Sequence, residues 1–116
     1  MSAARSKAKS ALAKLDEIEA EMKRIGFWSD DPPDLLADYQ AGTRQTYLDA
    51  PSFELWLQCV FLVNARDAAL ANALPTGSQV GEMARRQYDY HEVVPEAEKL
   101  LKLLHQFDRI ITGRSR

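Results

Sequence analysis

The stretch 53–63 is the feature that most constrains how this chain folds. Nine of its eleven residues are apolar, and only Glu54 and Gln58 interrupt it. Those two residues are four apart, so on a helix they share one narrow stripe while every other direction is apolar. A helix that is apolar almost all round packs against neighbours on several sides. The stretch therefore predicts a central helix enclosed by other helices, with side chains that form the core.

Helical spacing and helix-ending residues extend this prediction to the rest of the chain. In the first segment Ala8, Leu15 and Met22 belong to an apolar stripe that repeats every three or four residues, and Gly26 suits a helix end. Proline and serine at 51–52 suit the start of the central helix. We expect helices over 6–25, 34–40, 51–73, 78–90 and 94–112. The prediction is one all-α domain over 1–116, a small helical bundle of three long helices plus one or two short helices, in an orthogonal or up-down arrangement.

Acidic and basic residues are unevenly distributed along the chain. All 17 acids lie between Asp16 and Asp108, and that part carries a charge of −9, whereas the ends carry +7 and bring the net charge to −2. The cations of the two ends are Arg5, Lys7, Lys9, Lys14, Arg109, Arg114 and Arg116. We expect basic tails over about 1–10 and 113–116, either flexible or ordered. Such tails contact RNA phosphates or an anionic partner, or serve solubility alone.

The residues that catalysis, cofactors or metals require are sparse. Cys59 is the only cysteine, and His91 and His105 are fourteen residues apart. A metal site at Asp89, His91 and Glu92 is conceivable, but a solvated loop is the simpler interpretation. The glycine motifs that bind nucleotides are absent from the sequence. We therefore predict no catalytic, cofactor-binding or metal-binding residues and no enzymatic activity.

The cellular location follows from the cysteine content and the apolar runs. No apolar run reaches the ~20 residues of a membrane span. The start of the sequence lacks the apolar core of a secretory signal. A single cysteine suits a reducing compartment. We expect a cytoplasmic protein that does not enter a membrane.

Two groups of residues are candidates for an interaction or ligand surface. Aromatic residues concentrate in the first half of the chain, where Trp28 and Trp56, together with His105, mark a candidate pocket. The second group combines basic and aromatic side chains and comprises Arg85, Arg86 and Tyr88, with Tyr90 beside them. Mixed basic and aromatic side chains suit nucleic acid, although packing in a core explains the same aromatics.

Four pieces of the sequence occur in a recognisable order. They are 27–33 (FWSDDPP), 52–62 (SFELWLQCVFL), Leu74-Pro75 with Ser78 and Val80, and 103–111 (LLHQFDRII). Together they resemble the YqcC-like family of small uncharacterised bacterial proteins over about 12–111. The family pattern commonly continues its central block with Pro-Arg, whereas this chain has Val63-Asn64. The resemblance implies a small helical bundle without assigned catalytic residues. In some bacteria the family's gene lies beside that of a tRNA pseudouridine synthase, which implies an accessory role in RNA modification.

Three functions agree with these observations. The first is a non-catalytic protein-interaction module that binds a protein partner or forms a homodimer. The second is an RNA-binding accessory to a tRNA-modifying enzyme, a pseudouridine synthase, with tRNA as its ligand. The third is a small ligand-binding protein or enzyme with a pocket beside Trp28, Trp56 and His105.

Overall fold

The apolar stripe predicted for the first segment is buried in α1 (Ala3–Arg24) of the computed structural model, which describes residues 3–91 and 94–113. Leu15, Ile18 and Met22 are fully buried along this helix. Gly26 follows its end with a φ of +79°, a left-handed conformation that glycine adopts without strain. The helix predicted over 6–25 is thus α1, which begins three residues earlier than predicted and includes most of the basic segment 1–10.

The central helix is one rod made of three parts. These are α3 (Phe53–Trp56), the π-helical turn η2 (Leu57–Phe61) and α4 (Leu62–Leu70). Asp49 and Ser52 were both possible caps from the sequence, and Ser52 caps the rod, because its hydroxyl accepts from the Leu55 N–H at 3.1 Å. The rod ends at Leu70 rather than at 73, since Asn72 takes a left-handed φ of +54°.

The enclosure of this rod is less complete than predicted. Leu57, Val60 and Leu62 are buried, whereas Trp56 and Phe61 are half-buried. Neighbouring helices do not fully cover these two side chains. Their rings stack on each other, with 5.9 Å between the centroids, and so cover part of each other's apolar surface. The rod is therefore a core element with one edge at the surface.

Shorter elements complete the chain. They are α2 (Leu35–Ala41), the 3₁₀ turn η1 (Tyr47–Asp49), α5 (Val80–Arg85), the π-helical segment η3 (Arg86–His91), the 3₁₀ turn η4 (Pro95–Ala97) and α6 (Glu98–Thr112). The helix predicted over 78–90 is thus α5 and η3, and the one predicted over 94–112 is η4 and α6. Asp34 caps α2, and Gly113 ends α6 in the left-handed region.

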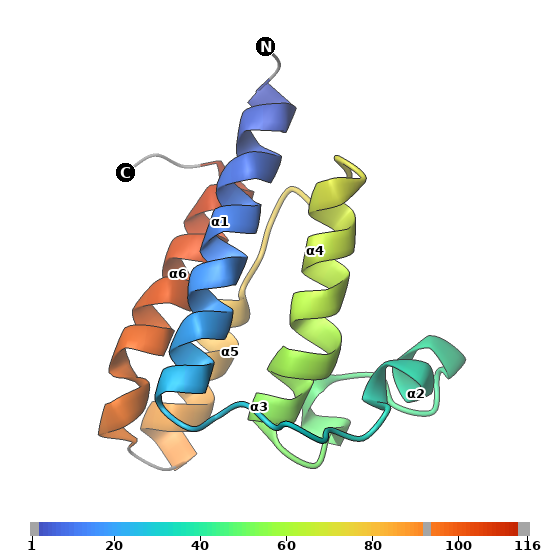
Figure 1. The fold of residues 1–116 in the computed structure, drawn as a ribbon, viewed down its shortest axis with the longest axis vertical. Helices are drawn as coiled ribbons and strands as arrows, with labels where there is room; N and C mark the ends of the chain where they lie inside the picture. Colours follow the sequence, from blue (N-terminus) through green and yellow to red (C-terminus); the bar gives the residue numbers. More distant parts are fainter. Residues whose placement is uncertain (1–2, 92–93, 114–116) are drawn as a thin grey trace.

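The helices form an up-down bundle (Figure 1). α1 lies against α6 and α4, and α5 packs on α6. α2 projects from the base of the bundle and contacts η2. The described residues contain no strand, so the predicted all-α bundle is confirmed. Among the helices over 3–91 and 94–113, none combines the length and apolar character needed to cross a bilayer.

One buried amide ties the loop after α1 to the central rod. Gln58 is 8% exposed, and its side-chain oxygen accepts from the Ser29 N–H at 2.9 Å while its amide donates to the Ser29 carbonyl at 2.8 Å. The side chain thus pairs with a backbone as a neighbouring strand would. This contact joins the sequence pieces 27–33 and 52–62 in space.

Replacing Gln58 with alanine is expected to lower the free energy of unfolding by about 2 kcal/mol, because two hydrogen bonds are lost at once. Urea denaturation measures the change. Gln40→Ala is the matched control: Gln40 is exposed on α2, so its substitution should stay within about 0.5 kcal/mol of the wild type. Equal effects of the two substitutions would contradict the role given to Gln58.

Candidate nucleic-acid interface

The aromatic side chains singled out by the sequence lie in the core and at its edge. Tyr88 is 4% exposed, and its hydroxyl donates a hydrogen bond to the Glu54 carboxylate. Burial, followed by that contact, raises the pKa of Tyr88. Its ring also contacts Phe53, which stacks on Trp56 at 5.8 Å between centroids. Trp28, in the loop after α1, is half-buried against the core, and the Lys23 ammonium lies 5.0 Å from its ring centroid. Tyr88 therefore serves packing, and the two tryptophans keep part of their surface exposed.

The charged candidates lie on α5, η3 and α6. Arg85 and Arg86 both face Glu82, at 2.6 and 3.6 Å from its carboxylate. The hydrogen bond from Arg85 is the main reason why the pKa of Glu82 is lowered. His105 of α6 faces α5, and its ring occupies the space that a side chain at Gly81 would need. The two arginines thus share one carboxylate, and His105 belongs to the contact between α5 and α6.

A carboxylate that the sequence analysis did not single out organises that contact. Asp108 of α6 accepts from the Ser78 hydroxyl at 2.6 Å, from the Val80 N–H at 3.0 Å and from the Gly81 N–H at 2.7 Å. It therefore caps the N-terminus of α5 from another helix. A signal for it was present, because Ser78, Val80 and the piece 103–111 all belong to the family-like pattern.

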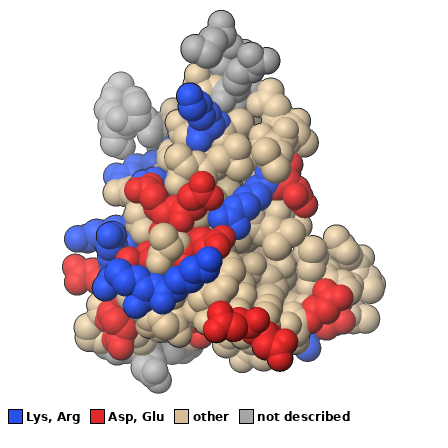
Figure 2. Space-filling model, viewed as in Figure 1, with Lys and Arg blue, Asp and Glu red and all other residues tan. Residues whose placement is uncertain are grey.

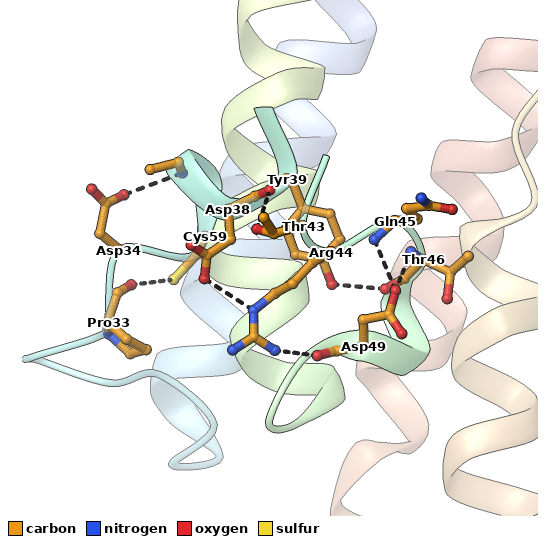
Figure 3. Close-up of polar contacts among 11 residues, drawn as sticks. Pro33, Asp34, Asp38, Tyr39, Thr43, Arg44, Gln45, Thr46, Asp49 and Cys59 are labelled. Carbon is orange, nitrogen blue, oxygen red and sulfur yellow. Dashed lines mark hydrogen bonds and ion pairs between the residues drawn. The ribbon is translucent and has the colours of Figure 1, made fainter. Parts of the chain in front are cut away.

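An open depression of about 510 Å³ lies between α2 and η1 (Figure 3). Its lining residues are Asp38, Thr43, Arg44, Gln45 and Asp49. The Arg44 guanidinium bonds to Asp38 at 3.0 Å and also to the Asp49 carbonyl. The Asp49 carboxylate accepts from the Gln45 and Thr46 N–H groups, and these bonds lower its pKa. The polar groups lining the depression thus mainly bind one another and hold the 42–50 loop in place.

The single cysteine lies beside this depression (Figure 3). Cys59 Sγ is 3.8 Å from the Pro33 carbonyl oxygen. Burial, with a smaller contribution from Asp34, raises the pKa of the thiol. A raised pKa reduces the thiolate fraction, and the thiolate is the nucleophilic form. The arrangement therefore suits packing better than nucleophilic chemistry.

The metal site considered at 89–92 involves side chains outside the described part of the structure. Within the described part, three or more potential ligands do not gather at one point.

The two basic ends of the chain meet at one end of the bundle. α1 and α6 are antiparallel, so the N- and C-termini lie at the same end in Figure 1. The Lys14 ammonium bonds to the Gln106 side-chain oxygen at 2.8 Å, which fixes the register of the two helices. Lys7 bonds to the Pro75 carbonyl at 3.2 Å and brings the α4–α5 loop to the same end. We call this end, formed by 3–15, 70–79 and 109–113, the basic pole.

The basic pole carries one sign of charge. The sequence contains no acid in 1–15, 68–81 or 109–116. Lys9 and Arg109 are exposed, and neither has a partner among the described residues. The nearby Asp108 carboxylate is occupied by three hydrogen-bond donors. On the face shown in Figure 2, red acidic side chains likewise leave the upper end free. The predicted tail cations at 114 and 116 lie outside the described residues; in the sequence they come within four residues of Thr112, where α6 ends.

The fold and this charged end define a small all-α protein with one basic pole. More specifically, the chain belongs to the family DUF446, described as tRNA pseudouridine synthase C, whose model matches residues 10–110. No curated protein and no solved structure matches the chain.

Proposed function

We propose that this protein is a non-catalytic accessory in tRNA pseudouridylation that binds RNA phosphates through its basic pole. The observation that carries the proposal is the convergence of two basic chain ends, far apart in the sequence, at one end of an otherwise acidic molecule. The family description supplies the class of RNA. The finer YqcC-like assignment is part of the same proposal, with a tRNA-modifying enzyme as the protein partner.

The charge distribution determines which part of the protein attracts RNA phosphates. Seven cations at the ends face a body of charge −9. Phosphates approaching the body are repelled, whereas those approaching the basic pole displace condensed counterions, and this release drives binding. Four of these cations, Lys7, Lys9, Lys14 and Arg109, lie on α1 and α6, which pack against each other, so their charges are already gathered before RNA arrives. The acidic body thus orients the RNA toward one end.

The non-catalytic part of the proposal is supported by the contacts and pKa directions of three potentially reactive groups. Asp108 is occupied as a helix cap, and Glu21, 3% exposed, is held by Arg24 at 2.5 Å. The hydrogen bond from Arg24 is the main reason why the pKa of Glu21 is lowered, which keeps it ionised and paired. The Cys59 thiol has a raised pKa. We therefore assign the chemistry on uridine to the partner enzyme.

The proposal predicts a salt-dependent affinity for tRNA. Neutralising about four phosphates gives a slope of about −3.6 for log K against log salt, so the affinity should fall roughly 100-fold between 50 and 200 mM salt. Fluorescence anisotropy with an unmodified tRNA transcript measures it. In the triple variant K7Q/K9Q/R109Q we expect at least about 10-fold weaker binding and a slope reduced by about 2 to 3.

The control is R86Q/K99Q/K102Q, which removes three cations from the other half of the molecule. It has the same net charge as the first variant and should bind tRNA within about 2-fold of the wild type. Equal losses in both variants would contradict the basic pole as the interface. The protein alone should leave uridine in the transcript unconverted. Absent tRNA binding would instead favour a protein-interaction role at Leu48 and Leu70, which are 72% and 73% exposed.

A further inference from the structure

The basic pole lacks the aromatic side chains that stack on bases. All ten aromatic residues lie between Phe27 and Phe107, and none occurs in 1–15, 68–81 or 109–116. Phe107 is the aromatic nearest to the pole along α6, and it is 3% exposed, with its ring 5.2 Å from that of Phe61. Proteins that bind single strands combine basic charge with exposed aromatic platforms. The pole has the charge and lacks the platforms.

The groups that the pole does present suit a sugar–phosphate backbone. Lys9 and Arg109 offer charge, and the same pole has exposed hydroxyls at Ser6, Ser10 and Thr76. Positive charge pairs with phosphate, and hydroxyl groups bond to phosphate oxygens and to ribose 2′-OH groups. These contacts position the nucleic-acid backbone and carry no information about the base sequence.

Acidic residues limit how far RNA can extend along the helices. Directly after the α1 part of the pole, Asp16 lies 3.2 Å from Arg66, and Glu17 lies 2.7 Å from Lys14. These acids thus pair with Arg66 and with Lys14, the last cation of the pole along α1. A single strand that followed α1 would pass from cations onto these carboxylates, so the favourable footprint is confined to the end of the bundle. A double helix presents many phosphates to so small an area, whereas a single strand presents few.

We propose that the basic pole binds the sugar–phosphate backbone of double-helical RNA and does not read the base sequence. The RNA contacts the protein at this end of the helical bundle. This inference rests on the proposed function and names the part of the tRNA that the protein contacts, namely a helical stem. The pole gives unstacked bases no aromatic contact to offset the lower charge density of a single strand.

The test compares three fluorescent RNA probes at one salt concentration. They are a hairpin with a stem of about 16 base pairs, the single strand of one side of that stem, and a hairpin with scrambled stem sequence. We expect the hairpin to bind at least about 10-fold more tightly than the single strand, and scrambling to change Kd by less than about 3-fold. K7Q/K9Q/R109Q should lose most of the preference for the hairpin.

Each outcome tests either the stem assignment or the proposed function. Equal or tighter binding of the single strand, or a strong effect of scrambling, would overturn the stem assignment while leaving RNA binding by the protein intact. Binding of none of the three probes would overturn the proposed function itself.

Discussion

Replacing Asp108 with alanine is expected to lower the free energy of unfolding by about 4 kcal/mol, the largest effect of any single change considered. Its carboxylate accepts three hydrogen bonds, from Ser78, Val80 and Gly81, at 2.6 to 3.0 Å. Hydrogen bonds to a charged group contribute about 1.5 to 3 kcal/mol each, and two backbone N–H groups would lose their partner. Gln79, the residue before α5, makes no cap of its own, so nothing replaces the lost acceptor.

Thermal or urea denaturation of the variant gives the answer directly. A loss of about 4 kcal/mol corresponds to a Tm lower by roughly 15 °C for a domain of this size. Asp108→Asn keeps one acceptor oxygen and should lose about half as much. Asp67→Ala, on the exposed end of α4, removes a carboxylate that has no side-chain partner among the described residues and should stay within about 0.5 kcal/mol. An unchanged stability of Asp108→Ala would remove the basis for treating α5 as capped by α6.

The parts of the fold that the sequence predicted are those that depend on neighbouring residues. The stripe through Leu15, Ile18 and Met22 is buried because helical period alone decides which face is apolar. Ser52 caps the start of the central rod and Gly113 ends α6, each through a contact within three or four residues. Signals of this kind are local, so a single sequence contains them.

The parts that the sequence did not predict depend on contacts across the chain. The π-helical turn η2 contains Gln58, whose partner Ser29 is 29 residues away. Asp108 caps α5 from 27 to 30 residues away. Tyr88 was grouped with two arginines as a surface, but its ring is enclosed by residues of the central rod and the loop after α1. No pattern along the chain says which distant side chain will arrive at a given backbone group.

The candidate interface depends partly on local composition and partly on how the chain folds. The sequence shows that both ends are basic, which is a local fact of composition. Their meeting depends on the number of passes that the chain makes: an up-down bundle with four main passes, α1, α4, α5 and α6, returns the C-terminus to the end where the N-terminus began (Figure 1). An odd number of passes would have put the two charges at opposite ends. The topology therefore turns two modest basic segments into one pole.

Replacing Gly81 with alanine is expected to destabilise the protein by about 3 kcal/mol, although alanine normally favours a helix. A Cβ at this position would lie 2.5 Å from His105 Nδ1 and 2.9 Å from Asp108 Oδ2. The gain in helix propensity is about 1 kcal/mol, whereas overpacking costs about 1 to 3 kcal/mol and the bond to Asp108 weakens as well. The steric term therefore outweighs the propensity term.

The double-mutant cycle with His105→Ala separates these two effects, because it removes the atom of closest approach and leaves the helix intact. In the His105→Ala background, Gly81→Ala should cost at most about 1 kcal/mol, which gives a coupling of about 2 kcal/mol between the two positions. Denaturant unfolding of the four proteins measures it. If Gly81→Ala costs the same in both backgrounds, His105 does not limit the space at Gly81. The close approach of α5 to α6, which places the α4–α5 loop at the basic pole, would then have another cause.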